Sequence, residues 1–210
     1  MKIDIIIPCY LLPDKDHELL WFTKRCVQSI RENVKNANVI IVDNGSWCDK
    51  DYLYGMADVY IELSENKGYA GGVNKGLELA SHSWVLVANN DIVIMPNCID
   101  EMIGAWKSST GAMSPHLETA PVMDTSCFGM CGALWMSRLD IIREVGYLDE
   151  GYGIGYYEDR DYWKRMECAG YGLRKAGYIF HQGNATSGKI TGLDAIMKEN
   201  ERRFKEKWGE

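Results

Sequence analysis

The chain has 210 residues, enough for one domain with a large hydrophobic core. Its 46% hydrophobic and 25% charged residues are typical of soluble globular proteins, and a net charge of -7 disfavours general binding to nucleic acid or anionic lipid. The sequence shows no signal peptide and no apolar run long enough to span a membrane, and the odd count of seven cysteines fits reduced thiols. These features predict a cytoplasmic protein, either free or peripheral to a membrane.

Hydrophobic spacing in the first half of the chain predicts alternating strands and helices. The elements, in chain order, are a strand over 3–8, a helix over 17–34, strands over 38–42 and 58–63, a helix over 69–81, a strand over 84–88 and a helix over 96–107. Pro96 suits the first turn of the last of these helices. This alternation implies an α/β fold with a mostly parallel central sheet and helices on both faces.

The second half of the chain is less regular. Residues 108–131 have the pattern of strand and loop, followed by a strand over 133–137, a helix over 158–169, a strand over 172–180 and a charged helix over 194–208. No repeat or linker divides the sequence. We therefore expect one domain over 1–190, followed by a short helical segment over 191–210.

The stretch that ends in Asn89, Asn90 and Asp91 is the most informative part of the sequence. The run from Trp84 to Ala88 does not alternate, which predicts a strand buried on both faces. Polar residues at the carboxyl end of such a strand indicate a ligand site, and a carboxylate there can hold a divalent cation against a phosphate. The alternative is a turn aspartate that caps the next segment. The buried strand and the two asparagines favour the functional interpretation.

Polar or aromatic residues also follow the first two predicted strands. Pro8 and Tyr10 end the first, and Asp43 opens the Asp-Asn-Gly-Ser turn after the second. Because parallel strands end at the same edge of a sheet, Tyr10 can cover a flat ring there and Asp43 can accept a hydrogen bond from a base or ribose. Ordinary turn chemistry explains the same residues, so both interpretations stay open.

A glycine-rich segment over 66–76 follows the third strand. Glycines let a backbone approach a ligand closely, and the helix start that follows favours anions. The spacing matches neither a dinucleotide fingerprint nor a P-loop. Asn66 and Asn74 can bond the hydroxyl groups of a sugar or ribose, and the alternative is a loop and first helical turn tightened by glycine.

Glu158 and Asp159 form a pair of carboxylates at a predicted helix start. Apolar residues follow Asp159 at helical spacing, so its side chain is expected to face the protein, where it is well placed to act as a general base. A favourable interaction with the helix dipole is the alternative. Asp161 and Arg165 are i,i+4 partners on another face, which indicates a structural role.

His181 ends the last predicted strand, 22 positions after Asp159. A lone histidine is usually structural or on the surface. Only the carboxylates predicted at the same edge make it a candidate metal ligand.

Seven segments occur in an order that resembles family 2 glycosyltransferases of the GT-A fold, with the rhamnosyltransferase-like branch nearest. They are IIIPCY, IIVDNGS, NKGYAGGVNKG, VANND, GALWMSR, GYLDEGYGIGYYEDRDYWKRMECAGYGL and FHQGNATSG. The resemblance covers roughly residues 2 to 190. It implies one GT-A domain, with a nucleotide-sugar-binding half over 1–107 and an acceptor and catalytic half over 108–190.

The resemblance also implies a reaction: an inverting, metal-assisted transfer of a sugar from a nucleotide-diphosphate donor, preferably UDP- or dTDP-linked, to an acceptor hydroxyl. The acceptor is a glycan, a lipid-linked molecule or another hydroxyl compound, and the cofactor is Mn²⁺ or Mg²⁺. By this resemblance Asp159 is the catalytic base and Asp91 and His181 bind the metal. The expected donor-binding residues are Pro8, Tyr10, Asp43, Asn66, Gly68, Asn74, Asn89 and Asn90, and the expected acceptor-binding residues are Gly132, Trp135 and Glu158, with Thr186 or Lys189 reaching the diphosphate.

Asn89 departs from the family pattern, because it occupies the first position of the D-x-D motif and removes one negative charge. A non-catalytic nucleotide-sugar-binding module is therefore an alternative, although Asp91, Asp159 and His181 together argue against it. A sugar-phosphate nucleotidyltransferase is a weaker alternative, because the loop after the first strand, PCYLLPDKDHE, contains no glycine.

Overall fold

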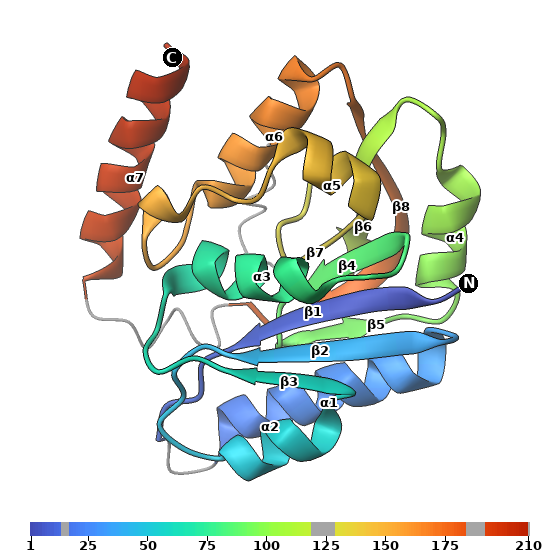
Figure 1. Cartoon of the computed structure of the whole chain (residues 1–210), viewed down its shortest axis with the longest axis vertical. Coiled ribbons are helices and arrows are strands. Elements are labelled where there is room, and N and C mark those ends of the chain that lie inside the picture. Colours follow the sequence, from blue (N-terminus) through green and yellow to red (C-terminus); the bar gives the residue numbers. More distant parts are fainter. Residues whose placement is uncertain (14–16, 119–128, 184–191, 210) are drawn as a thin grey trace.

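The computed structural model describes residues 1–13, 17–118, 129–183 and 192–209. They form an eight-stranded sheet with helices on both faces, and the C-terminal helix stands on the side where β1 and β2 end (Figure 1). The elements in chain order are β1 (Ile3–Cys9), α1 (Glu18–Asn33), β2 (Ala37–Asp43), α2 (Lys50–Met56), β3 (Val59–Glu62), α3 (Gly68–Leu79), β4 (Trp84–Ala88), β5 (Ile92–Ile94), α4 (Cys98–Ala105), β6 (Thr110–Leu117), β7 (Leu134–Arg138), α5 (Leu139–Val145), the 3-10 helix η1 (Glu150–Tyr152), α6 (Glu158–Cys168), β8 (Gly172–His181) and α7 (Leu193–Trp208).

The central strand β1 shows why the sheet is covered on both faces. Successive side chains of a strand point to opposite sides. Ile5 and Ile7 belong to the core that β1 shares with α1 and α4, whereas Ile6 belongs to the core on the side of α3, α5 and α6. All three side chains are fully buried. The apolar stretches over residues 5–7 of β1 and 84–88 of β4 are therefore explained by burial on two faces.

The strand order is β3-β2-β1-β4-β7-β6-β8-β5. Strands β3, β2, β1 and β4 are parallel to one another, as are β6 and β8, whereas β7 is antiparallel to both β4 and β6, and β5 is antiparallel to β8. The predicted α/β fold with a mostly parallel sheet is confirmed. The antiparallel strands bring the start of β7 and the end of β8 to the edge where β4 ends.

The observed elements depart from the predicted ones in length and number. Pro96 is not in the first turn of α4, because α4 begins at Cys98 after Asn97 takes a left-handed conformation with φ of 64°. The prediction also missed four short elements, which are α2, β5, α5 and η1. Strand β5 has three residues and α2 buries only Leu53, so neither produces a clear hydrophobic period.

Across the described ranges, no helix combines the length and the apolar character that crossing a membrane requires.

Candidate active site

The ends of β4 and β8 and the start of β7 meet at one edge of the sheet. Ala88 at the end of β4 pairs with Leu134, and Ile92 of β5 pairs with His181 at the end of β8. The Asn89 backbone N–H donates to the Ala133 carbonyl oxygen at 2.8 Å. Segments far apart in the sequence are thereby joined around the Asn-Asn-Asp turn.

Asp91 and His181 form a close pair at this edge. His181 Nε2 lies 3.1 Å from Asp91 Oδ1, across 90 positions of sequence. The Gln182 N–H donates to the Asp91 carbonyl oxygen at 3.1 Å, which fixes the end of β8 to the turn. The side chains are 8% and 18% exposed, so both remain accessible at one side. The two residues expected to bind a metal are therefore neighbours.

The two asparagines before Asp91 have different environments. Asn90 donates from Nδ2 to Thr23 Oγ1 of α1 at 2.9 Å, which anchors the turn. Asn89 Oδ1 is buried and has no hydrogen-bond partner among the described residues. A buried amide oxygen without a partner is costly, because its desolvation is not compensated. Within the ranges that the structure describes, Asn89 Oδ1 therefore lacks the partner that a buried polar atom normally has.

The donor atoms at this edge fit a divalent cation that shares its coordination with a phosphate. Asp91 offers a carboxylate and His181 an imidazole nitrogen, both of which bind Mn²⁺, and the carboxylate also suits Mg²⁺. Within the residues that the structure describes, no group of three or more His, Cys, Asp or Glu is arranged to hold an ion.

Glu158 and Asp159 begin α6, where Glu158 is buried and Asp159 is half-buried. Glu158 is 6% exposed, and its Oε2 has no hydrogen-bond partner in the described part of the chain. Burial, and secondarily the charge of Asp159, raises the pKa of Glu158 to about 8. Burial also raises the pKa of Asp159, although the Arg160 backbone N–H donates to its Oδ1 at 2.7 Å and the Arg160 charge opposes the shift. The pair therefore combines a glutamate that is readily protonated with an aspartate whose proton affinity is raised.

Gly132 and Tyr69 connect the carboxylate pair to the rest of the edge. A Cβ on Gly132 would stand 2.5 Å from Asp159 Oδ2, so these two residues are in direct contact. The Tyr69 hydroxyl lies 3.4 Å from the Gly132 carbonyl oxygen. Burial raises the pKa of Tyr69, and nearby Glu158, Asp159 and Asp91 raise it further. Tyr69 was not among the site residues predicted from the sequence, although the glycine-rich segment in which it lies was predicted to bind a ligand.

Asp43 is held by its own turn. Its Oδ1 accepts from the Ser46 N–H and its Oδ2 from the Tyr60 hydroxyl, each at 2.8 Å, and the side chain is fully buried. These contacts are the turn chemistry that was one of the two open interpretations. Pro8 lies in β1 and Tyr10 directly after it, both partly exposed at the same edge. Contact of these residues with a base or ribose stays a prediction.

Asn44 is a residue that sequence reasoning missed, although it sits in the Asp-Asn-Gly-Ser turn. Its Nδ2 donates to Asn66 Oδ1 at 3.1 Å and to the Gly68 carbonyl at 2.8 Å, and its Oδ1 accepts from the Lys67 N–H at 2.9 Å. It thus joins the loops after β2 and β3. Gly68 has φ of 75°, and a Cβ there would stand 1.8 Å from the Gly153 carbonyl oxygen, so a side chain cannot fit.

Two of the expected contacts are corrected by the structure. Asn74 donates to the Leu148 carbonyl at 2.9 Å and to Glu150 Oε1 at 2.8 Å and accepts from the Leu148 N–H at 3.0 Å, so its amide holds the segment before η1 rather than a donor. Trp135 is 1% exposed and packs against Tyr162 and Trp163, with ring centroids 5.4 Å and 5.5 Å away. Because Tyr162 and Trp163 cover the Trp135 ring, it cannot stack on an acceptor. Thr186 and Lys189 lie outside the described residues.

Similar solved structures have the same fold at low sequence identity. S. aureus TarS 1-349 in complex with UDP-GlcNAc matches with a TM-score of 0.72 and 13% identity, over 97% of this chain and 65% of that one. The mannosyltransferase PcManGT from Pyrobaculum calidifontis, in complex with GDP-Man and Mn²⁺, matches with a TM-score of 0.70 and 14% identity, over 92% and 59%. GalNAc-T7 with UDP, GalNAc and Mn²⁺ matches with a TM-score of 0.69 and 12% identity, over 97% and 50%.

This chain thus spans 50% to 65% of those three solved chains, and the likeness establishes the GT-A fold. No curated protein sequence matches it. The family model described as glycosyl transferase family 2 matches residues 4–120, which is more than half of the chain and includes the turn with Asn89, Asn90 and Asp91. On this match the chain belongs to glycosyl transferase family 2.

Proposed function

We propose that this protein is an inverting glycosyltransferase that moves a sugar from a nucleotide-diphosphate donor to an acceptor hydroxyl. The observation that carries the proposal is the meeting of two pairs at one sheet edge. Asp91 and His181 form one pair, and Glu158 and Asp159 form the other. The two pairs are connected through the start of β7. Gly132 contacts Asp159, and the next residue, Ala133, accepts a hydrogen bond from the Asn89 backbone. Family membership supports the reaction class.

Asp159 is the base in this proposal. A half-shielded carboxylate with a raised pKa is a stronger proton acceptor than one in water. The acceptor oxygen forms a bond to the anomeric carbon while its proton passes to Asp159. The bond between that carbon and the diphosphate oxygen breaks in the same step, which inverts the configuration. Glu158 and Gly132 border the acceptor.

Asp91 and His181 are the proposed metal ligands, with the Asn89 amide oxygen close to them in sequence. Bound Mn²⁺ or Mg²⁺ would act as a Lewis acid that stabilises negative charge on the leaving diphosphate. The presence of Mn²⁺ in the PcManGT and GalNAc-T7 structures supports a divalent metal. Asn90 contributes by anchoring the turn to α1.

The donor is proposed to lie along the ends of β1 and β2. Pro8, Tyr10 and Asp43 would hold the base and ribose, and Asn66 and Gly68 would close the site. UDP-GlcNAc in TarS and GDP-Man in PcManGT support a nucleotide sugar as the class of donor. On the sequence resemblance we propose that the donor is UDP- or dTDP-linked and that the protein belongs to the rhamnosyltransferase-like branch. On the same ground the acceptor is a glycan or a lipid-linked molecule, as in polysaccharide biosynthesis.

A cytoplasmic location is also part of the proposal. Cys9, Cys26 and Cys98 are buried thiols, which fits a reducing compartment.

A non-catalytic nucleotide-sugar-binding module is the second candidate, favoured by Asn89 at the first D-x-D position. A module of this kind has no need for a buried carboxylate pair with raised pKa values, and such a pair is typical of catalytic sites.

A thermal-shift screen tests the proposal directly. Nucleoside diphosphates and nucleotide sugars are each added with Mn²⁺, Mg²⁺ or EDTA, because a ligand that binds only the folded state raises the melting temperature. We expect a shift that needs the metal and selects one base, followed by release of nucleoside diphosphate in a turnover assay. Metal-dependent binding without turnover on any acceptor would support the module instead, and the absence of any nucleotide shift would remove the donor site.

A further inference from the structure

The C-terminal helix α7 packs against the turn that leads into the carboxylate pair (Figure 1). Asn200 of α7 is 6% exposed, and its Nδ2 lies 2.8 Å from the Tyr152 carbonyl oxygen, 2.8 Å from that of Gly155 and 3.1 Å from that of Tyr156. An amide nitrogen has two hydrogens, so the three carbonyl groups share them. One side chain of α7 is thus hydrogen-bonded to three backbone carbonyl groups within residues 152–156.

The turn that Asn200 holds has an unusual backbone. Tyr156 and Tyr157 have φ of 72° and 75°, a left-handed conformation that side chains other than glycine rarely adopt. Consecutive left-handed residues persist only where the surroundings hold them. The carbonyl groups of Gly155 and Tyr156 belong to the two peptide planes that flank Tyr156. Asn200 therefore fixes the orientation of both planes, two residues before Glu158.

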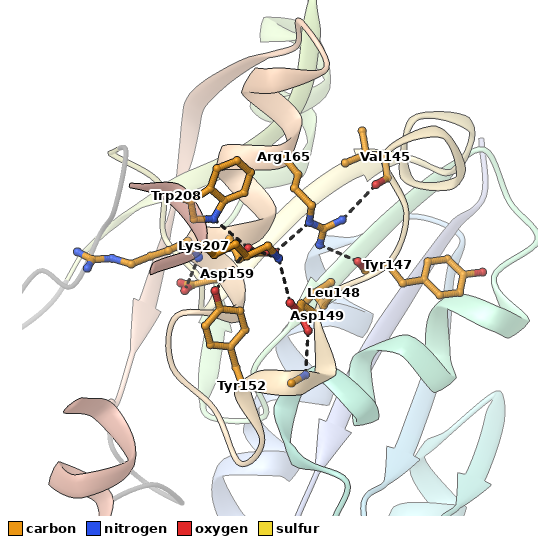
Figure 2. A network of polar contacts seen from close by, with 12 residues as sticks. Val145, Tyr147, Leu148, Asp149, Tyr152, Asp159, Arg165, Lys207 and Trp208 are labelled. Atoms are coloured by element: carbon orange, nitrogen blue, oxygen red, sulfur yellow. Dashed lines mark hydrogen bonds and ion pairs between the residues drawn. The ribbon is translucent and has the colours of Figure 1, made fainter. Parts of the chain in front are cut away.

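A second set of contacts connects the end of α7 to α6. Figure 2 shows Lys207 and Trp208 of α7 beside Asp149. Trp208 Nε1 donates to Asp161 Oδ1 at 3.0 Å, and Lys207 Nζ lies 2.7 Å from Asp161 Oδ1 and 2.9 Å from Asp149 Oδ2. Asp161 is fully buried and also accepts from Arg165 Nε at 3.0 Å. Asp161 lies one helical turn from the start of α6. Helix α7 therefore contacts both the turn over residues 152–156 and the first turn of α6, which follows it.

The other side of the same turn contacts the glycine-rich donor loop. The Tyr69 N–H donates to the Ile154 carbonyl at 3.0 Å, and Gly68 packs directly on the Gly153 carbonyl. The turn is therefore held between α7 and the loop expected to close over the donor. A change in the turn would alter the position of Asp159 relative to the donor.

We propose that α7 positions the catalytic base, with Asn200 as the positioning residue that holds the left-handed turn and so orients Asp159 toward the acceptor. This inference rests on the proposed function. It predicts that loss of the Asn200 amide slows the chemical step and leaves nucleotide binding nearly unchanged. Asn200 need not contact either substrate.

The test replaces Asn200 with Asp, which keeps the size of the side chain and removes both N–H donors. Asn33→Asp is the matched control, because Asn33 Nδ2 also donates to two carbonyl groups, Ser29 at 3.0 Å and Ile94 at 3.1 Å, but between α1 and β5. Each variant is examined by amide hydrogen exchange over residues 150–161 and by melting-temperature shift with UDP-GlcNAc or GDP-mannose and Mn²⁺. Release of nucleoside diphosphate is then measured with water as the acceptor, whose oxygen bonds the sugar carbon while its proton passes to Asp159.

We expect Asn200→Asp to raise exchange over 150–161 and to lower kcat about tenfold or more, with KM for the nucleotide sugar within about threefold of wild type. Asn33→Asp is expected to keep wild-type kcat and wild-type exchange in that segment. Unchanged exchange in Asn200→Asp would show that the amide does not hold the turn, and raised exchange with wild-type kcat would show that the held turn does not position the base. Either result overturns the inference.

Trp208→Phe provides a second variant if Asn200→Asp does not fold. It removes the N–H donor to Asp161 and keeps an aromatic ring. We expect a lower kcat with unchanged KM, and a wild-type kcat overturns the inference. If the wild-type protein itself neither binds a nucleotide nor releases diphosphate, the proposed function fails, whereas the exchange comparison still decides whether Asn200 holds the turn.

Discussion

Gly132 touches the carboxylate of Asp159: a Cβ on Gly132 would stand 2.5 Å from Oδ2 and 3.4 Å from Cγ. The absence of a side chain at this position creates the space that the carboxylate occupies. Gly132 lies two residues before β7 and Asp159 lies in the first turn of α6, so one close approach sets the position of the proposed base against the central sheet.

Substitution of Gly132 with Ala is expected to lower kcat for transfer by about tenfold or more, because the added methyl group displaces the Asp159 carboxylate and a displacement near 1 Å can cost a factor of about 100. The melting-temperature shift with nucleotide and metal should stay near that of wild type. Gly104→Ala is the control, since a Cβ there meets nothing within 4 Å. Wild-type turnover in Gly132→Ala would show that this contact does not set the base.

Asp159→Asn is expected to abolish most transfer while donor binding is retained, because the amide keeps the shape of the side chain but cannot accept the acceptor's proton. Removal of a general base typically lowers the rate by a factor of about 100 to 10,000. The measurement is kcat beside the dissociation constant of the nucleotide sugar. Near-normal turnover on the true acceptor would remove Asp159 from the base position.

Asp91→Ala is expected to remove the metal-dependent part of the nucleotide shift. His181 then lacks its carboxylate partner at 3.1 Å, and the site loses its negative charge. The check is a titration with Mn²⁺ at fixed nucleotide, with EDTA as the metal-free reference. Asp140→Ala serves as the control, because that side chain is 64% exposed and pairs with Arg138. An unaltered Mn²⁺ titration in Asp91→Ala would exclude Asp91 as a ligand.

The fold could be predicted from the sequence because its strands carry a strong local signal. The central strands β1 and β4 are mostly apolar, and this pattern predicted the sheet, which the structure confirms. The neighbours of each polar residue could not be predicted in the same way. Asn74 and Leu148 are 74 positions apart, and nothing local to Asn74 shows that its amide is used by that loop.

The role of Trp135 shows the same limit for an aromatic residue. A tryptophan near an expected acceptor site suits sugar stacking, but the same ring also fills cores. Only the placement of α6 over β7 decides between the two roles, because Tyr162 and Trp163 cover the ring. This placement depends on long-range packing, which the periodicity of a single segment does not contain.

Trp135→Ala is therefore expected to destabilise the protein by about 3 to 5 kcal/mol, the usual range for loss of a large buried aromatic side chain. Urea denaturation measures the free energy of unfolding. Trp47→Ala is the matched control, because Trp47 is 74% exposed and its loss should change stability by no more than about 0.5 kcal/mol. Equal stability of the two variants would contradict the core assignment and restore an acceptor role.

The buried Glu158 is expected to make stability depend on pH. Its pKa is about 8 in the folded protein against 4.5 for an unburied side chain, mainly because of burial. Between these values the folded state keeps a proton that the unfolded state has released. The free energy of unfolding therefore falls as pH rises through this window, by up to about 1.4 kcal/mol per pH unit, and this contribution is flat below it.

Glu158→Gln should remove this dependence, because the amide stays neutral at every pH. We expect the variant to melt at a higher temperature than wild type near pH 8.5, with the difference shrinking toward about pH 5. Glu167→Gln is the control, since it makes the same change at an exposed position of α6. Parallel curves of melting temperature against pH for wild type and Glu158→Gln would show that Glu158 is ionised in the folded protein. Glu158 and Asp159 would then carry two negative charges beside the acceptor rather than one.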